Sequence, residues 1–248
     1  MEKKALAHWS MSIKHVKRQI PGVNIHISFC LFVATILQDG DIMPNRQRNA
    51  LRCRGRTCRW PRSRGGKVYV PYVISSSYTD DEKNIIVNAL DSFMTDTCVT
   101  FVLKTDQLDY LDFFPGSGCW SYLGRTGGRQ RISLQQRGCV YKGTVQHEAL
   151  HALGFHHEQA RSDRNRYIRI LTQNIRPGAE RNFERQKTNN LRTPYDFNSI
   201  MHYSKYAFSK NGQPTIVAKR NPSQDLGRAK EMSQTDILRV NKLYRCRN

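Results

Sequence analysis

The chain has 248 residues, and its 40 Lys and Arg side chains against 20 Asp and Glu side chains give a formal net charge of +20 at pH 7. This length allows one or two domains with a substantial core. The charge favours anionic partners, but the sequence contains no zinc-finger spacing, RNP motif or basic-zipper pattern, so nucleic acid is not an expected partner.

Residues 1–48 are predicted to form a leader segment. The apolar run from Ile25 to Leu37 is too short to span a bilayer comfortably, so no stable membrane anchor is expected. Together with the lysines that precede it, this run is typical of a signal peptide at residues 14–37. The run starts late and lacks a clean cleavage site, so an aberrant leader or a misplaced start codon is the alternative.

Seven cysteines occur, and six remain when Cys30 in the leader is set aside. An even number favours disulfides in an oxidising compartment, but the sequence alone does not choose among the many pairings, and free buried thiols are the alternative. Cys53 and Cys58 interrupt an arginine-rich stretch from Arg52 to Arg64. This interruption favours a disulfide-pinned, solvated surface loop over a nucleic-acid or localisation patch.

The next elements are predicted to be strands and one helix. Residues 67–74 are rich in β-branched and aromatic side chains and predict a strand, with Pro71 marking an edge or a bulge. Strands are also predicted at residues 99–103 and 110–114, and an alternating edge strand at residues 131–135. A capping box at Thr79 begins a helix. One face of this helix is predicted to be apolar, formed by Ile85, Ile86, Ala89, Leu90 and Phe93.

The stretch from His147 to His157 contains the pattern H-E-x-x-H-x-x-G-x-x-H. On a helix, His147 and His151 lie one turn apart on one face and can bind one metal ion. Gly154 can adopt positive φ, end the helix and let His157 return as a third ligand. Three protein ligands and one water make an open, catalytic zinc site, with Glu148 placed to take a proton from the water. Unrelated surface histidines are the alternative, which the length of the pattern disfavours.

Downstream, Ser199-Ile200-Met201-His202-Tyr203 places Met201 where metzincins need a Met-turn beneath the metal. A lone methionine is more often core filler, but the zinc pattern upstream favours the Met-turn. Prolines and glycines interrupt the rest of the second half, which is therefore predicted to be irregular. A last helix is predicted from about Ser233 to Tyr244, presenting Ile237, Leu238, Leu243 and Tyr244.

The chain resembles the astacin family of secreted zinc endopeptidases. The resemblance covers about residues 49–248 and rests on three sets of residues: 147–158, then Arg161, Asp163 and Arg164, then 199–203. Within that family, the cysteine pattern and residues 49–53 look most like fish hatching enzymes (choriolysins) and nephrosin. One departure is Asn165, where the family usually has an aspartate, so the local pairing of that aspartate is in doubt.

The resemblance implies an α+β fold of the metzincin or zincin-like type, with a catalytic domain at residues 49–248. One lobe would hold helices and a twisted, mostly parallel sheet with an antiparallel edge strand. The other lobe would be irregular, with one Zn²⁺ in the cleft between the two. The strand at residues 131–135 would pair with an extended substrate through its backbone, and a structural strand with a solvated edge is the alternative. The implied disulfides are Cys53–Cys58, Cys98–Cys246 and Cys119–Cys139.

The resemblance also implies a latent form. In astacin pro-segments a Gly-Asp motif places its carboxylate on the zinc, and Gly40-Asp41 fits this motif, although a loop aspartate is the alternative. A trypsin-like activator cutting after Arg48 would create a new N-terminus at Asn49. In the family that amino group is buried and interacts with the glutamate after the third zinc histidine, here Glu158.

The expected activity is hydrolysis of peptide bonds by a zinc-activated water, with Glu148 as general base. The resemblance gives Tyr203 the role of stabilising the oxyanion, and a core tyrosine beside the Met-turn is the alternative. His156 and His202 lie off the ligand spacing and are not assigned to zinc.

We expect a secreted monomer. Storage in secretory granules before release is an optional part of this expectation. Its partners would be an activating protease and an extended polypeptide substrate, either anionic or an egg-envelope glycoprotein. The alternatives are a nephrosin-like protease of another tissue, an inactive zinc-bound binding protein and a basic nucleic-acid-binding protein. The intact Glu148 and Tyr203 argue against an inactive protein, and the metal motif argues against a nucleic-acid-binding one.

Overall fold

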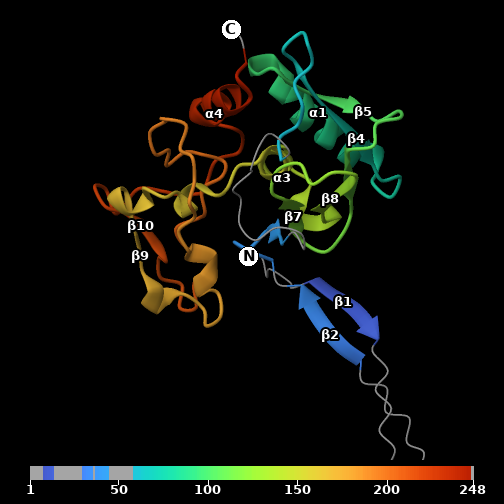
Figure 1. Ribbon diagram of the computed structural model, residues 1–248. Coiled ribbons are helices and arrows are strands. Elements are labelled where there is room, and N and C mark those ends of the chain that lie inside the picture. Colours follow the sequence, from blue (N-terminus) through green and yellow to red (C-terminus); the bar gives the residue numbers. More distant parts are fainter. Residues whose placement is uncertain (1–7, 14–29, 36, 45–57, 247–248) are drawn as a thin grey trace, which may run out of the picture.

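The structure is a computed structural model that describes residues 8–13, 30–35, 37–44 and 58–246. Within these residues, a hairpin of β1 (His8–Ile13) and β2 (Cys30–Thr35) projects away from the rest of the chain (Figure 1). The same described part contains no helix that is both long and apolar enough to span a membrane.

The main sheet has six strands in the order β3-β7-β8-β6-β4-β5. Their bounds are β3 (Ile42–Met43), β4 (Val68–Ile74), β5 (Val99–Leu103), β6 (Tyr110–Phe114), β7 (Cys119–Tyr122) and β8 (Arg129–Leu134). Strands β5, β4, β6 and β8 run parallel to one another, whereas β7 is antiparallel to β8. This sheet confirms the predicted fold class: it is mostly parallel, and its one antiparallel pairing, between β7 and β8, lies toward one edge.

The prediction that residues 131–135 form the edge strand is wrong. They belong mainly to β8, which lies between β6 and β7. The alternation of polar and apolar residues was misleading because Ser133 is buried and its hydroxyl donates to the carbonyl of Gly118 at 2.9 Å. The antiparallel strand that lies toward the edge is β7, and its outer side carries β3 in parallel, with Ile42 opposite Ser121.

Pro71 does not mark an edge strand either, because β4 lies between β5 and β6. The pairing of β4 with β6 begins only at Tyr72, opposite Leu111. The missing N–H of Pro71 therefore falls at the end of that ladder, where a proline is tolerated.

Helix α1 (Asp80–Asp96) begins at the predicted capping box. The Thr79 hydroxyl accepts from the Glu82 N–H at 3.3 Å, and the Glu82 carboxylate accepts from the Thr79 N–H at 2.9 Å. The predicted apolar face is buried except for Ile85, which is 37% exposed. Each helical residue turns by about 100°, so Ile85 lies at the margin of the stripe that its neighbours bury.

The zinc-motif helix α3 (Lys142–Leu153) lies at the centre, with the sheet and α1 on one side and the C-terminal half on the other (Figure 1). It follows a short helical turn, α2 (Gln136–Cys139). The C-terminal half is irregular, as predicted. Before its final helix, its regular elements are four 3-10 turns and one small ribbon: η1 (Glu158–Ala160), η2 (Arg164–Arg166), η3 (Thr172–Asn174), η4 (Glu180–Phe183), and β9 (Ile168–Ile170) paired with β10 (Ile216–Ala218).

Two apolar clusters hold these parts together. The larger one joins the sheet, α1 and α3 to Met201, Val240 and Tyr244 from the C-terminal half. The smaller one lies within that half and contains Ile168, Ile175, Phe183, Tyr195, Ile216 and Leu226. The last helix, α4 (Gln234–Tyr244), therefore packs on the main core through Val240 and through the predicted Ile237, Leu243 and Tyr244. The fourth predicted residue, Leu238, is 43% exposed, so the prediction was wrong there.

The described part of the chain contains the predicted disulfides Cys98–Cys246 and Cys119–Cys139. Cys98 and Cys246 are 148 residues apart, so their bond closes a long loop and stabilises the fold by about 2–4 kcal/mol through the unfolded state. Cys58 is disulfide-bonded too. Its predicted partner Cys53 lies outside the described residues, as does Asn49.

Candidate metal centre and catalytic site

Helix α3 and the turn after it bring three histidines together. Apolar side chains of α3, among them Leu150 and Leu153, enter the main core and fix the orientation of the helix. Gly154 ends it with a φ of 105°, and its N–H donates to the carbonyl of His151 at 2.8 Å. Only a residue that tolerates positive φ can make this turn, which then delivers His157.

The Nε2 atoms of the three histidines converge on one point. The Nε2 of His147 is 3.1 Å from that of His151 and 3.3 Å from that of His157. His151 and His157 are fully buried. Lone pairs at such distances repel each other unless a cation or a proton lies between them, so this arrangement fits a metal ion.

Hydrogen bonds at Nδ1 determine which ring nitrogen of two of these histidines carries no hydrogen. The Nδ1 of His147 donates to the carbonyl of Ile200 at 2.9 Å, and the Nδ1 of His151 donates to the carbonyl of Phe155 at 2.7 Å. A carbonyl only accepts, so both rings carry their hydrogen on Nδ1 and leave Nε2 free to bind a metal. Burial lowers the pKa of His151 to about 3, which keeps that ring neutral.

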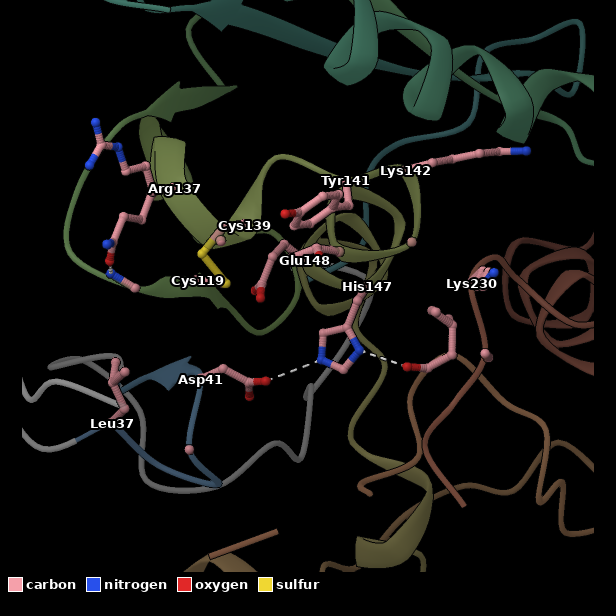
Figure 2. A pocket seen from close by; sticks show the side chains of 18 residues that line it. Leu37, Asp41, Cys119, Arg137, Cys139, Tyr141, Lys142, His147, Glu148 and Lys230 are labelled. Atoms are coloured by element: carbon pink, nitrogen blue, oxygen red, sulfur yellow. Dashed lines mark hydrogen bonds and ion pairs between the residues drawn. A yellow bond between two sulfur atoms is a disulfide. The ribbon is translucent and has the colours of Figure 1, made fainter. Parts of the chain in front are cut away.

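Asp41 completes the group (Figure 2). Its carboxylate oxygens lie 3.1 Å from the Nε2 of His147, 3.1 Å from that of His157 and 3.4 Å from that of His151. Although burial acts in the opposite direction, the three histidines hold the pKa of Asp41 well below its usual range. Three imidazoles and one carboxylate are ligands that Zn²⁺ accepts, and these four residues could hold one such ion.

Glu148 lies beside this group and lines a cleft of about 860 Å³ together with His147. It is 1% exposed, and its Oε2 has no hydrogen-bond partner among the described residues. Burial raises the pKa of Glu148 well above its ordinary value, and the negative Asp41 raises it further. A buried carboxylate oxygen without a partner is costly, which is typical of a group kept for chemistry.

Met201 and Tyr203 lie where the sequence motif places them. Met201 is 3% exposed and belongs to the main core, and its carbonyl accepts from the N–H of Glu158 at 2.9 Å. The ring of Tyr203 packs on His157 with a centroid distance of 4.6 Å. Its hydroxyl donates to the carbonyl of Asp39, so it reaches the same segment that carries Asp41.

Glu158 lies in a buried ion-pair cluster that the sequence did not predict. Arg239 donates to both carboxylate oxygens at 2.7 and 2.8 Å, and Arg161 contributes a third contact at 3.3 Å. Burial raises the pKa of Glu158, although the two arginines act in the opposite direction. The only signal for Arg239 in the sequence is its place one helical turn after Asp236 in the predicted last helix, which does not point to Glu158.

Asn165, His156 and His202, which the structure does describe, lie outside the metal group. Asn165 is exposed on η2, and its amide oxygen accepts from the Arg164 Nε at 3.1 Å, so the residue still pairs locally without the family's charge. His202 is buried, its Nδ1 donates to the carbonyl of Tyr203, and burial lowers its pKa to about 4. His156 lies 3.7 Å from Asp39.

Comparisons with known proteins agree with this geometry. Residues 56–245 match the peptidase family described as Astacin. The chain is 45% identical to high choriolytic enzyme 1 of Oryzias latipes over 213 residues, which are 86% of this chain and 79% of that protein. It is 46% identical to the low choriolytic enzyme of the same species over 212 residues, which are 85% of this chain and 78% of that protein.

Solved structures agree as well. High choriolytic enzyme 1, a hatching enzyme zinc-protease from Oryzias latipes, has a TM-score of 0.78 at 46% identity and covers 80% of this chain and 100% of its own. Myroilysin, with a TM-score of 0.55 at 20% identity over 78% of this chain and 98% of its own, supports the fold alone. The chain therefore belongs to the astacin family and is a zinc metalloendopeptidase.

Proposed function

We propose that this protein is a secreted endopeptidase that is made in a latent form, in which its own residues 39–43 occupy the catalytic cleft. The observation that supports this most is the Asp41 carboxylate, which lies within 3.4 Å of all three zinc-motif histidines. The disulfides of the chain favour an oxidising, extracellular environment.

In the active form, His147, His151 and His157 bind the metal, and Glu148 is the general base. Zn²⁺ held there supplies Lewis acidity, which polarises a carbonyl and makes water acidic near neutral pH. Glu148 lies in the cleft beside His147 with its Oε2 unpartnered among the described residues, so this oxygen is free to take a proton from the attacking water. Glu148 then passes this proton to the nitrogen of the leaving amine.

Tyr203 is the group to which we assign stabilisation of the oxyanion. Its ring packs on His157, which holds the hydroxyl at the border of the metal group. That hydroxyl already donates to a peptide carbonyl, that of Asp39. A substrate carbonyl that becomes negatively charged would accept the same hydrogen bond more strongly, which is what lowers the barrier.

Latency rests on three contacts of the segment from Asp39 to Met43. Asp41 lies on the histidines, the Asp39 carbonyl holds Tyr203, and β3 lies against β7 with the Ser121 N–H donating to the Asp41 carbonyl at 3.0 Å. An extended substrate would need the same strand edge and the same hydroxyl. A cut after Arg48 by a trypsin-like protease would allow the segment to leave.

Gly40 is the residue that lets this segment pass over Tyr203. It has a φ of +83°, and a Cβ there would lie 2.8 Å from the Tyr203 hydroxyl oxygen and 2.9 Å from Phe208. A larger residue would suffer both backbone strain and a collision with the aromatic side chains.

Glu158 is our proposed partner for the new amino group of Asn49. A cavity of about 260 Å³ adjoins Glu158 and is lined also by Cys58, a few residues along the chain from Asn49. The amino group would be the third positive group around the Glu158 carboxylate, after Arg161 and Arg239. The single negative charge of Glu158 would therefore offset only part of the cost of burying the amino group.

The substrate class is proposed from charge and from relatives. Arg137, Lys142 and Lys230 line the catalytic cleft, and the chain carries a net charge of +20. This favours an anionic polypeptide, which positive charges attract from a distance. Relatives named choriolytic enzymes point to egg-envelope glycoprotein as the physiological example.

The test uses the full chain, oxidised, loaded with zinc and activated by limited trypsin treatment. Cleavage of casein is measured with and without a zinc chelator, beside the variant Glu148→Gln. We expect cleavage that the chelator abolishes and that the variant lacks although it binds zinc. Cleavage by the variant at the parental rate would remove Glu148 from its role, and a parent that binds zinc without cleaving casein would contradict the endopeptidase activity itself.

A further inference from the structure

The first turn of α4 lies directly behind the Met-turn and contacts it through Asp236. This carboxylate is 3% exposed. Its Oδ1 accepts from the Ser199 hydroxyl at 2.6 Å, and its Oδ2 accepts from the N–H groups of Ile200 at 2.9 Å and Ser233 at 3.0 Å. All three partners are donors, so both oxygens must accept, which a carboxylate does and an amide does not.

The Ser199 hydroxyl carries this contact one step further. While it donates to Asp236, it accepts from the N–H of Met201 at 3.1 Å. The N–H of Met201 and the carbonyl of Ile200 belong to the same peptide group. Asp236 therefore holds one end of this peptide through Ser199.

The other end of the same peptide holds a zinc-motif histidine. The carbonyl of Ile200 accepts from the Nδ1 of His147 at 2.9 Å. In a planar trans peptide the N–H and the carbonyl point in opposite directions, so a rotation of one end rotates the other. Losing the acceptor of the Ser199 hydroxyl would thus let the Ile200 carbonyl turn away from His147.

We propose that Asp236 is a positioning residue of the metal site, which acts through Ser199 and the Ile200–Met201 peptide on His147. It fixes the plane of the imidazole and keeps its hydrogen on Nδ1, so that Nε2 stays bare and aimed at the other two histidines. This inference rests on the zinc site of the proposed function and adds to it a residue about 90 positions away in the sequence.

A purely structural role for Asp236 also has to be considered, because Asp236 completes the capping box of α4 with Ser233. Loss of such a box destabilises a helix whatever lies beyond it. Helix α1 offers a matched control, since Thr79 and Glu82 form the same box. The bonds of that box reach Gln136 but no residue of the metal group.

The experiment measures metal binding by the full-length chain and not its activity. Zn²⁺ affinity is obtained by competition with a chromophoric chelator, the ligand geometry from the absorption spectrum of the Co²⁺-loaded chain, and stability from the melting temperature. The variants are Asp236→Ala, Asp236→Asn, Ser199→Ala, the double variant Asp236→Ala/Ser199→Ala, and the control Thr79→Ala.

We expect Asp236→Ala to weaken Zn²⁺ binding about tenfold or more and to change the Co²⁺ spectrum, as loss of a residue that orients a ligand does. Ser199→Ala acts in the same direction, and the double variant is no worse than Asp236→Ala because both residues lie on one path. Thr79→Ala lowers the melting temperature but leaves the affinity and the spectrum as in the parent.

If Asp236→Ala does not fold, Asp236→Asn and Ser199→Ala carry the test, since Asn at 236 keeps one acceptor for the N–H groups but removes the acceptor of the Ser199 hydroxyl. Parental affinity and spectrum in these variants, with only a lower melting temperature, would overturn the proposal. A parent chain that binds no zinc would instead contradict the proposed function on which it rests.

Discussion

The metal group is contacted from two sides that differ in kind. From the front, the segment from Asp39 to Met43 contacts it with one carboxylate, one carbonyl and a strand of two residues. From the back, the Ile200 carbonyl of the Met-turn accepts from His147, and the buried Glu158–Arg239 pair ties the residue after His157 to α4. Met201 of the Met-turn and Val240 of α4 belong to the main core. In the latent form that we propose, the front is the side that leaves and the back is the side that stays, since only the back belongs to segments that also pack in the main core.

The largest effect is expected at the back, from Glu158→Gln. This change removes the close carboxylate partner of the buried Arg239 and leaves Arg161 with Asp163 alone, and breaking one partner of a buried ion pair costs about 3–5 kcal/mol. Urea unfolding monitored by circular dichroism measures the loss. The control Glu184→Gln changes an exposed glutamate and should be neutral. Equal stability of Glu158→Gln and the parent would mean that the cluster does not hold the back of the site.

At the front, Asp41→Ala should release the latent form. It removes the carboxylate that would share a bound Zn²⁺ with the three histidines. Taking this contact as worth about 1.5–3 kcal/mol, as a hydrogen bond to a charged group is, the open fraction should rise roughly tenfold to a hundredfold. The measurement is casein cleavage by the uncut chain, with intactness checked on a gel. Asp106→Ala, which changes an exposed aspartate far along the chain, is the control. An uncut variant as inactive as the parent would show that β3 alone closes the cleft.

Gly40→Ala should open the front more weakly. Positive φ costs a non-glycine residue roughly 1–2 kcal/mol, and the new Cβ would also meet Tyr203 and Phe208. We expect a rise in the activity of the uncut chain by a factor of about 5–30. Gly178→Ala separates the two causes, because Gly178 has a φ of +84° with nothing within 4 Å of its added Cβ. A similar gain from both variants would mean that general destabilisation, and not the contact with Tyr203, opens the cleft.

The smallest effect is expected at the outer end of the ion-pair cluster, from Asp163→Asn. The hydrogen bonds from Arg161 hold the pKa of Asp163 below its usual value. A depressed pKa stabilises the folded state above the unfolded value of about 3.9 and loses this contribution as the pH falls through the folded value. The variant should therefore lose at most about 1 kcal/mol at pH 7 and melt like the parent well below pH 3. A difference that persists in acid would point to packing and not to charge.

The sequence predicted what local chemistry controls. The capping box at Thr79, the zinc helix and its end at Gly154 follow from residues within one or two turns of each other. The order of the strands does not follow from neighbouring residues, because a strand lies at the edge only when no other strand pairs with its outer side. Ser133 is a polar residue whether its side chain faces water or donates to the Gly118 carbonyl. The same holds for the back of the site, where Arg239 meets Glu158 over 81 residues. The carbonyls of Asp39 and Ile200 contribute backbone atoms, which carry no signature in any sequence.

The Cys98–Cys246 bond has a consequence for how the protein tolerates cutting. It makes one covalent ring of everything from the start of β5 to the end of α4, including all three histidines, Glu148, Tyr203 and Asp236. A protease that cuts any single peptide bond within this ring leaves one covalently connected molecule, because the disulfide still joins the two pieces. The cut we propose after Arg48 lies outside the ring, and so does Asp41. Among single cuts, the one that frees the front of the site can release a piece, whereas one inside the ring cannot separate the catalytic residues from one another.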